Sequence, residues 1–105
     1  NGFKILEKNY RCPLGEIDVV AEKKGRTFFI EIKTRSQSYF GLPEESVNTF
    51  KQKRLVRLAQ WYLKGQRLGD IPVSFGVLAV TWKGCEDPQV RLIENAFTAD
   101  SVGEY

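Results

Sequence analysis

Two runs of alternating apolar and polar residues flank a short break in the first third of the chain. The runs read EIDVVAEK and RTFFIEIKTR, and the break includes Lys24 and Gly25. Alternation with a period of two is typical of a half-buried β-strand. A glycine at a two-residue break supplies the positive φ that a tight turn requires. The pattern therefore predicts a β-hairpin over residues 16–35.

A stripe of apolar residues at helical spacing appears in the middle of the chain. Leu55, Leu58, Ala59 and Tyr62 recur at i, i+3, i+4 and i+7, which is the repeat of one helix face. Extending this stripe backwards by one turn reaches Lys51 and Gln52, so the core-facing side of the predicted helix becomes polar at its start.

Strand-like runs occupy the remaining parts of the chain. They lie at residues 2–12, 73–82 and 89–97, which gives the order β-β-β-α-β-β. A chain of 105 residues supports one hydrophobic core. We expect a single α/β domain over residues 1–105, with a mixed sheet and the helix on one of its faces.

Composition narrows the chemistry that the domain can use. The absence of histidine excludes His-based acid/base catalysis and Cys/His zinc sites. Cys12 and Cys85 are too few for a zinc site or a disulfide scaffold, and we expect reduced thiols. The net charge of +3 permits a polyanionic partner without requiring one. No apolar run is long enough to span a membrane, and we expect a cytoplasmic protein.

The register of the predicted hairpin brings two acids together. With Lys24 and Gly25 at the turn, Asp18 lies opposite Glu31, and Glu16 lies opposite Lys33. The other face is wholly apolar and is the expected core face; its members are Ile17, Val19, Ala21, Phe28, Ile30 and Ile32.

Like charges placed directly opposite each other destabilise a strand pair. A proton on one carboxyl group would relieve the repulsion between Asp18 and Glu31. A divalent cation between them would also do so, and Mg²⁺ or Mn²⁺ prefers such oxygen ligands. Lys33 would lie beside that cation. The simpler interpretation is a solvated strand face with a cross-strand ion pair between Glu16 and Lys33.

The motifs GEIDVVA and FFIEIKTRS resemble the core of the PD-(D/E)XK, or restriction-endonuclease-like, nucleases. With GFKILEKNYRC, FGLPEESV and IENAF, the chain more closely resembles the YraN family of bacterial proteins, which is related to archaeal Holliday-junction resolvases. The resemblance implies a mixed sheet flanked by helices. These nucleases open with a helix, and the chain starts just after the place where that helix is expected.

The resemblance also implies a set of site residues. Asp18 and Glu31 would bind Mg²⁺ or Mn²⁺, with the carbonyl of Ile32 as a third ligand. Lys33 would be the catalytic lysine, which positions water or stabilises the transition state. Glu16 has no fixed role in the pattern and is treated as auxiliary.

Polar residues near this motif are candidates for nucleic-acid contacts. Arg35 and Ser36 follow Lys33 along the strand, and Lys51 and Gln52 lie at the start of the helix. Tyr39 and Phe40 would either stack on bases or pack the loop onto the core. The other basic residues of the helix, Lys53, Arg54, Arg57 and Lys64, are interpreted as a solvated face, with contacts to backbone phosphate as the alternative.

These features lead to alternative hypotheses about function. One is a metal-dependent endonuclease that hydrolyses phosphodiester bonds in branched or structured DNA, acting as a homodimer because two cuts need two sites. Another is a non-catalytic nucleic-acid-binding module that keeps the nuclease fold. A third is a protein-interaction domain without a nucleic-acid partner.

Overall fold

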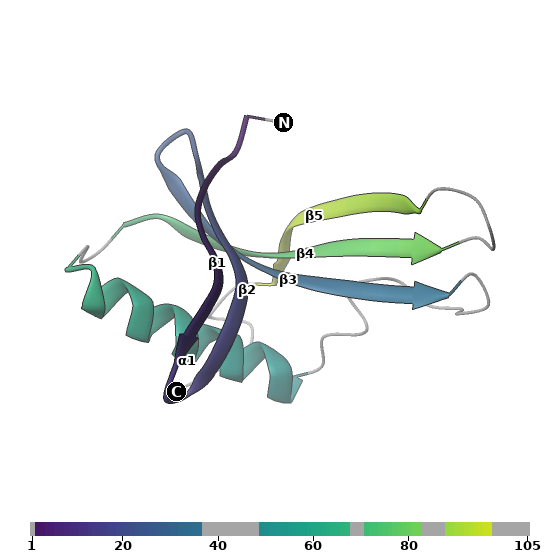
Figure 1. Ribbon diagram of the computed structural model, residues 1–105. Helices are drawn as coiled ribbons and strands as arrows, with labels where there is room; N and C mark the ends of the chain where they lie inside the picture. The colour runs from purple at the N-terminus through teal and green to yellow at the C-terminus, as the bar shows by residue number, and fades with distance from the viewer. Residues whose placement is uncertain (1, 37–48, 68–70, 83–87, 98–105) are drawn as a thin grey trace.

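The computed structural model describes residues 2–36, 49–67, 71–82 and 88–97. Within these residues the order of elements is the predicted β-β-β-α-β-β (Figure 1). The elements are β1 (Lys4–Cys12), β2 (Gly15–Lys23), β3 (Arg26–Ser36), α1 (Thr49–Gly65), β4 (Val73–Trp82) and β5 (Gln89–Phe97).

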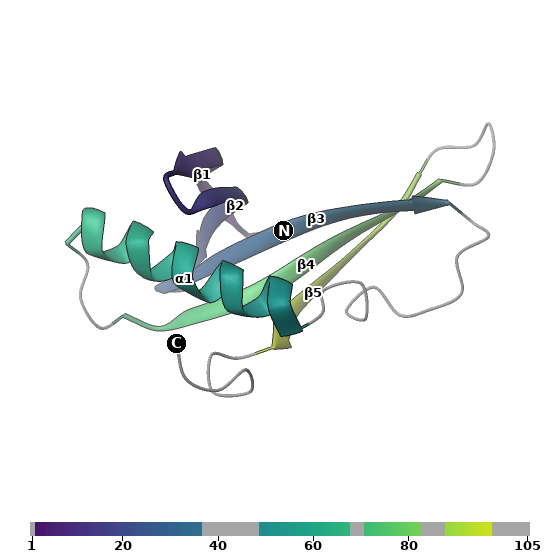
Figure 2. The same ribbon diagram turned by 90° about the horizontal axis from the view of Figure 1, so that it is seen from below.

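The five strands form one mixed sheet in the order β1-β2-β3-β4-β5. Neighbouring strands are antiparallel except β3 and β4, which are parallel, and α1 lies in the connection between them. The helix packs on one face of the sheet (Figures 1 and 2). The expected α/β architecture is confirmed, and the described residues contain one helix rather than helices on both faces.

The predicted hairpin between β2 and β3 is confirmed at its turn. Lys23 pairs with Arg26, and both residues between them have positive φ, 53° for Lys24 and 78° for Gly25. Two such residues make the tight turn whose twist matches the strands on either side. The register then continues in the expected way up to the pair of Val19 and Ile30.

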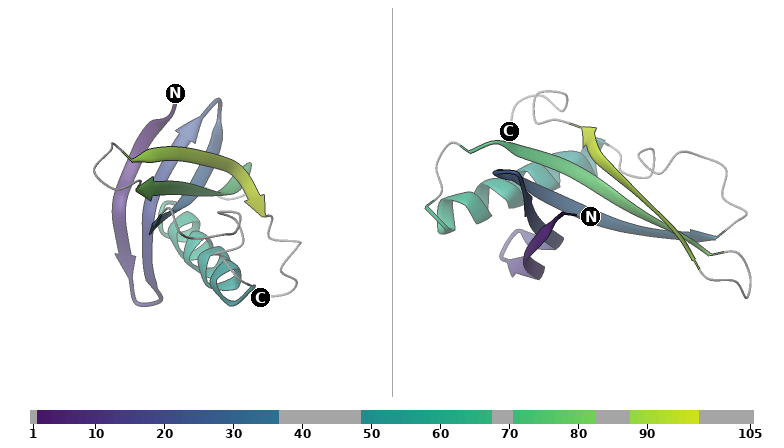
Figure 3. Two further views of the ribbon diagram at one scale, coloured as in Figure 1. Left: turned by 90° about the vertical axis from the view of Figure 1, so that its right-hand side faces the viewer. Right: turned by 90° about the horizontal axis from the view of Figure 1, so that it is seen from above.

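Beyond that pair the two strands separate. β3 continues beside β4 as far as the pair of Ser36 and Trp82, whereas its ladder with β2 ends at Val19 and Ile30. β1 and β2 bend away and run steeply across the direction of β4 and β5 (Figure 3). The start of β2 turns toward α1, because Ile17 is only 1% exposed and belongs to the core beneath the helix.

The predicted core face is wrong in part. The helix covers the opposite face, where Val20 and Phe29 are fully buried against the helical stripe of Leu55, Leu58, Ala59 and Tyr62. On the expected core face, Ala21, Phe28 and Ile30 form a smaller cluster that packs against Phe3, while Ile32 is 39% exposed. Strands in the middle of a sheet carry apolar residues on both faces, so alternation alone did not identify the face that meets the helix.

Candidate active site

The site lies where β2 and β3 separate, and we call Asp18, Glu31, Lys33 and Lys51 the fork cluster. Asp18 comes from β2, Glu31 and Lys33 from β3, and Lys51 from the first turn of α1. Three elements thus contribute to it, and all three have residues in the core between the helix and the sheet. The first three residues are the catalytic candidates predicted from the sequence.

Asp18 replaces a main-chain partner at the end of the ladder. In the hairpin register the main-chain N–H of Ile32 would face the carbonyl of Ile17. Instead the Ile32 N–H donates a hydrogen bond of 2.8 Å to Oδ2 of Asp18. The carboxylate therefore accepts the hydrogen bond from β3 that the main chain of β2 no longer accepts. This bond holds Asp18 at the point where the two strands separate. A charged acceptor makes a main-chain hydrogen bond shorter and stronger than a neutral one.

Glu31 and Lys33 lie two residues apart and point to the same side of β3. Lys33 Nζ is 3.1 Å from Glu31 Oε2, and the two side chains are 24% and 15% exposed. The contact is an ion pair without the alignment of a hydrogen bond, since Oε2 is buried and has no hydrogen-bond partner among the described residues. Buried polar atoms are nearly always hydrogen-bonded, and exceptions need an explanation.

The two lysines of the cluster influence each other. Burial lowers the pKa of Lys33, but its interactions with Glu31, Lys51 and Asp18 outweigh this effect and raise the pKa above its ordinary value. The pKa of Lys51 is lowered, chiefly by its interaction with the neighbouring Lys33. Lys33 therefore keeps its proton at neutral pH, and Lys51 loses its proton more easily than an ordinary lysine.

The carbonyl of Ile32 lies on the correct edge of β3 for the third predicted ligand. In an extended strand the N–H and C=O of one residue point toward the same neighbouring strand. The N–H of Ile32 is directed to Asp18, so its carbonyl faces the same side, past the end of the β2 ladder. The cluster thus presents two carboxylates and one main-chain carbonyl.

This donor set fits a small hard cation. Mg²⁺ is usually held by one or two carboxylates and completes its shell with water and substrate phosphate. No group of three or more His, Cys, Asp or Glu side chains that could hold a metal ion occurs in the described ranges. The described residues therefore fit an Mg²⁺-like site of few protein ligands, and the unsatisfied Glu31 oxygen is a donor such an ion could use.

Two details of the predicted pairing are wrong. The ladder between β2 and β3 stops one pair before Asp18 and Glu31, so these residues flank the separation instead of forming a regular strand pair. Glu16 does not face Lys33; it pairs with Arg11 of β1, with Arg11 Nε 3.6 Å from Glu16 Oε2. The reason is the bend of β2 toward α1, which carries Glu16 away from β3.

The structure places only some of the predicted nucleic-acid contacts. Lys51 joins the fork cluster, and Gln52 is half-buried next to it on α1. Arg35 and Ser36 end β3 beside Thr81 and Trp82 of β4, but the placement of their side chains is outside the described structure. The predictions for Tyr39, Phe40 and Cys85 also concern residues outside the described ranges, whereas Cys12 is a half-buried free thiol.

One neighbouring surface was missed by the sequence analysis. Phe50, Lys53, Arg54 and Arg57 surround a pocket of about 210 Å³ together with Leu14. The three basic residues were interpreted as a solvated face, with phosphate contacts only as the alternative, and Phe50 was not singled out. The signal was present, because these four residues also recur at i, i+3, i+4 and i+7.

The fold is that of an α/β protein with a mixed sheet. Its candidate site is polar and partly buried, and it consists of two carboxylates and a lysine at the point where β2 and β3 separate. Residues 1–80 match the model of a family described as "Uncharacterised protein family UPF0102". The chain belongs to this family, which is the YraN family that the sequence motifs predicted.

Curated relatives support this membership over most of the chain. A UPF0102 protein of Moorella thermoacetica is 46% identical over 99 residues, which cover 92% of this chain and 82% of the relative. A UPF0102 protein of Syntrophotalea carbinolica is 41% identical, covering 94% and 80%. One of Geobacter metallireducens is 41% identical, covering 90% and 77%. In the described part of the chain, no helix is long and apolar enough to cross a membrane.

Proposed function

We propose that the chain is a restriction-endonuclease-like, metal-dependent nuclease that hydrolyses phosphodiester bonds in branched or otherwise structured DNA. Asp18 and Glu31 would hold Mg²⁺ or Mn²⁺, with the carbonyl of Ile32 as a further ligand. The observation that carries the proposal is the buried Oε2 of Glu31, which is 3.1 Å from Lys33 Nζ but has no hydrogen bond within the described part of the chain.

The residues of the fork cluster have complementary roles in this proposal. A bound divalent cation supplies the Lewis acidity that polarises a phosphodiester and lowers the pKa of water. Lys33 stays protonated at neutral pH because the neighbouring carboxylates raise its pKa. It is therefore suited to stabilise the negative charge that develops on the phosphate in the transition state, and less suited to act as a general base.

Residues around the cluster would hold the substrate. Lys51 adds positive charge beside Lys33 at the start of α1, where the helix also presents main-chain N–H groups to anions. Arg35, Ser36 and Gln52 are further candidates for contacts with the DNA backbone. A homodimer would provide the two sites that paired cleavage of a junction requires.

A second candidate function is a nucleic-acid-binding module without turnover. The observation that favours it is the number of acidic side chains, because the described residues supply two carboxylates to the fork cluster and no third. In this alternative the basic surface of α1 binds nucleic acid, and Lys33 has no catalytic role.

A cleavage experiment separates the two functions. The full-length protein is incubated with a four-way junction, a flap, a single strand and a duplex, in Mg²⁺, in Mn²⁺ and in chelator. Lys33→Ala is compared with Lys23→Ala, since both lysines lie on strands, pair with a glutamate and are about equally exposed, 24% and 26%. We expect metal-dependent cleavage of a structured substrate that is lost in Lys33→Ala and kept in Lys23→Ala.

Other outcomes have clear meanings. Cleavage that persists in chelator or in Lys33→Ala would overturn the proposed mechanism. Binding without cleavage of any of the four substrates, in either metal, would establish the non-catalytic module instead.

A further inference from the structure

The outer surface of α1 carries basic side chains and no acidic ones. The helix contains five lysine or arginine residues and no aspartate or glutamate. Three of the basic side chains, Lys53, Arg54 and Arg57, line the pocket next to Phe50 and form no ion pair within the described ranges. Such an unbalanced surface attracts a polyanion and is typical of contacts with a nucleic-acid backbone.

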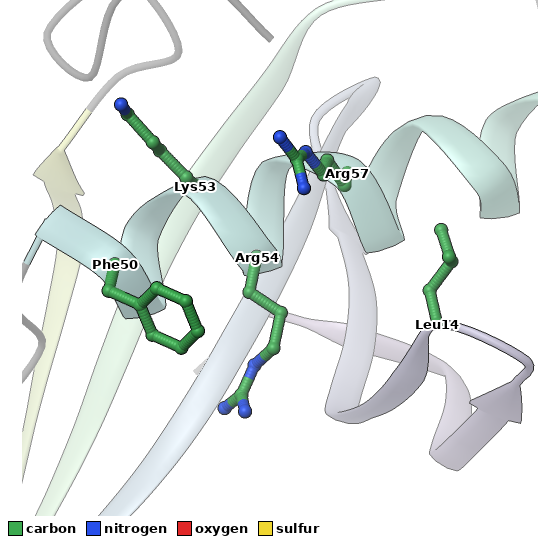
Figure 4. A pocket seen from close by; sticks show the side chains of 5 residues that line it. All are labelled: Leu14, Phe50, Lys53, Arg54 and Arg57. Atoms are coloured by element: carbon green, nitrogen blue, oxygen red, sulfur yellow. The ribbon is translucent and has the colours of Figure 1, made fainter.

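An aromatic ring lies within this basic surface. Phe50 is 74% exposed, which makes it the most exposed of the large apolar side chains of the described residues. Figure 4 shows Phe50 and Arg54 extending from the same edge of α1, whereas Leu14 lies on the turn between β1 and β2, nearer to Arg57. A single exposed apolar residue is common and needs no explanation. An exposed ring bordered by cations is the arrangement on which unpaired bases stack.

The pocket is adjacent to the fork cluster. Phe50 directly precedes Lys51, and Arg54 follows Lys51 by three residues, so it lies one turn further along the same helix. Lys51 in turn interacts with Lys33. A DNA strand whose phosphate lies at the fork cluster would therefore pass along the same edge of α1 that carries Phe50 and Arg54.

We propose that this pocket binds an unpaired nucleotide of the DNA substrate next to the phosphate at the fork cluster. The base would stack on Phe50 and contact Leu14, and the flanking phosphates would bind Arg54 and Arg57. The inference rests on the proposed nuclease function and deepens it, because it names the substrate as DNA in which at least one nucleotide beside the cleavage site is unpaired. A fully paired duplex would have no unpaired base to stack on Phe50.

The test measures binding in chelator, so that it does not depend on turnover. The full-length protein is titrated into two duplexes of the same sequence, one fully paired and one with a single unpaired 2-aminopurine, whose fluorescence reports stacking. Fluorescence anisotropy of an end label gives the affinity for each. Phe50→Ala is compared with Trp61→Ala, an exposed aromatic on the same helix, about 16 Å further along at 1.5 Å per residue.

We expect the wild-type protein to bind the DNA with the unpaired base more tightly and to change the 2-aminopurine fluorescence. Phe50→Ala should weaken this binding by about 5-fold or more, the loss of one base stack, and should leave the paired duplex nearly unaffected. Trp61→Ala should behave as the wild type. Circular dichroism checks that each variant is folded, which the exposure of Phe50 favours.

The basic residues are tested by charge removal on the same helix. Arg54→Gln and Arg57→Gln should each weaken binding to both DNAs and lower the slope of log affinity against log salt by about 1. Lys64→Gln, at the other end of α1, should leave the slope unchanged. The inference is overturned if Phe50→Ala affects both DNAs equally, or if neither Phe50→Ala nor the arginine variants change binding. Absence of cleavage by the wild-type protein, with this binding pattern intact, would instead overturn only the proposed nuclease function.

Discussion

Strand β3 has a polar cluster near each end, and the two clusters differ in how well their groups are paired. The hairpin-end cluster consists of Lys23, Arg26, Ser74 and Glu94. Arg26 Nη1 donates hydrogen bonds to the Val73 carbonyl at 2.8 Å and to Ser74 Oγ at 3.0 Å. Lys23 pairs with Glu94 at 3.5 Å and lies over the ring of Phe3. These contacts tie together β2, β3, β4 and β5 and explain the presence of each charge.

The fork cluster is arranged differently. Two ammonium groups lie close enough to lower the pKa of one of them. Glu31 Oε2 is buried and, although it is 3.1 Å from Lys33 Nζ, has no hydrogen bond among the residues that the structure describes. Asp18 accepts the Ile32 N–H, but the ladder of β3 with β4, which continues through Glu31 and Lys33, does not need the charges of these two residues. Most buried polar groups of a protein have hydrogen-bond partners. Groups that lack a partner tend to occur where the protein acts on another molecule. The comparison therefore separates a cluster with a structural role from the cluster for which we propose a functional one.

The largest expected effect is on cleavage, and it should differ between the two glutamates. Glu31→Gln removes a proposed metal ligand and should reduce cleavage of a structured DNA on the order of 10²–10³-fold. Glu94→Gln removes the acid of the hairpin-end cluster and should change cleavage less than 2-fold, or about 0.4 kcal/mol. Rates are measured under single-turnover conditions. Equal losses in both variants would remove the distinction between the clusters.

The second effect is on stability, and here a change in the hairpin-end cluster should have the larger effect. Arg26→Gln removes hydrogen bonds to Val73 and to the buried Ser74 and should lower the free energy of unfolding by about 1–2 kcal/mol. Cleavage by the folded variant should be unchanged. Urea denaturation provides the free energy. A folded Arg26→Gln protein that has lost cleavage would show that the hairpin-end cluster also serves the site.

The third effect separates the two roles of Asp18. Asp18→Ala removes the acceptor for the Ile32 N–H and should lower the free energy of unfolding by about 1 kcal/mol. Asp18→Asn keeps an acceptor oxygen and should retain most of that stability, while both variants lose cleavage. Thermal denaturation of the two variants, run in parallel, measures the difference. If Asp18→Asn were as unstable as Asp18→Ala, the stabilisation by this hydrogen bond would depend on the negative charge of Asp18.

The smallest effect concerns the two lysines of the fork cluster. The depressed pKa of Lys51 means that its proton costs stability in the folded state, so stability should rise with pH as this proton leaves. Lys51→Gln should therefore be slightly more stable than the wild type at neutral pH. The difference should vanish as the pH approaches 10.5, the ordinary value for lysine. Melting temperatures at several pH values test this, and a less stable Lys51→Gln at neutral pH would contradict it.

The local parts of this structure could be predicted from the sequence. The turn at Lys24 and Gly25 fixed the register as far as Val19 and Ile30, because a two-residue turn leaves one choice of pairing. The helical stripe was also confirmed as the buried side of α1. Both features depend on residues that are close in sequence.

The separation of β2 from β3 could not be predicted in this way. It follows from the burial of Ile17 beneath α1, a contact between residues far apart in sequence that hairpin geometry does not include. The same bend moved Glu16 to Arg11 and left Asp18 to bind the Ile32 N–H. The sequence therefore correctly predicted that Asp18, Glu31 and Lys33 are neighbours. It did so from a regular strand pairing, which the structure does not have at these residues.

A titration with Mn²⁺ tests the central claim most directly, because it asks whether the unsatisfied fork cluster holds a cation. Binding is followed by isothermal calorimetry and by the electron paramagnetic resonance of free Mn²⁺. The account predicts one Mn²⁺ per chain in the wild type and in Arg26→Gln, and loss of that site in Glu31→Gln and in Asp18→Asn. A wild-type protein that binds no Mn²⁺, or a Glu31→Gln variant that binds it equally well, would contradict the account.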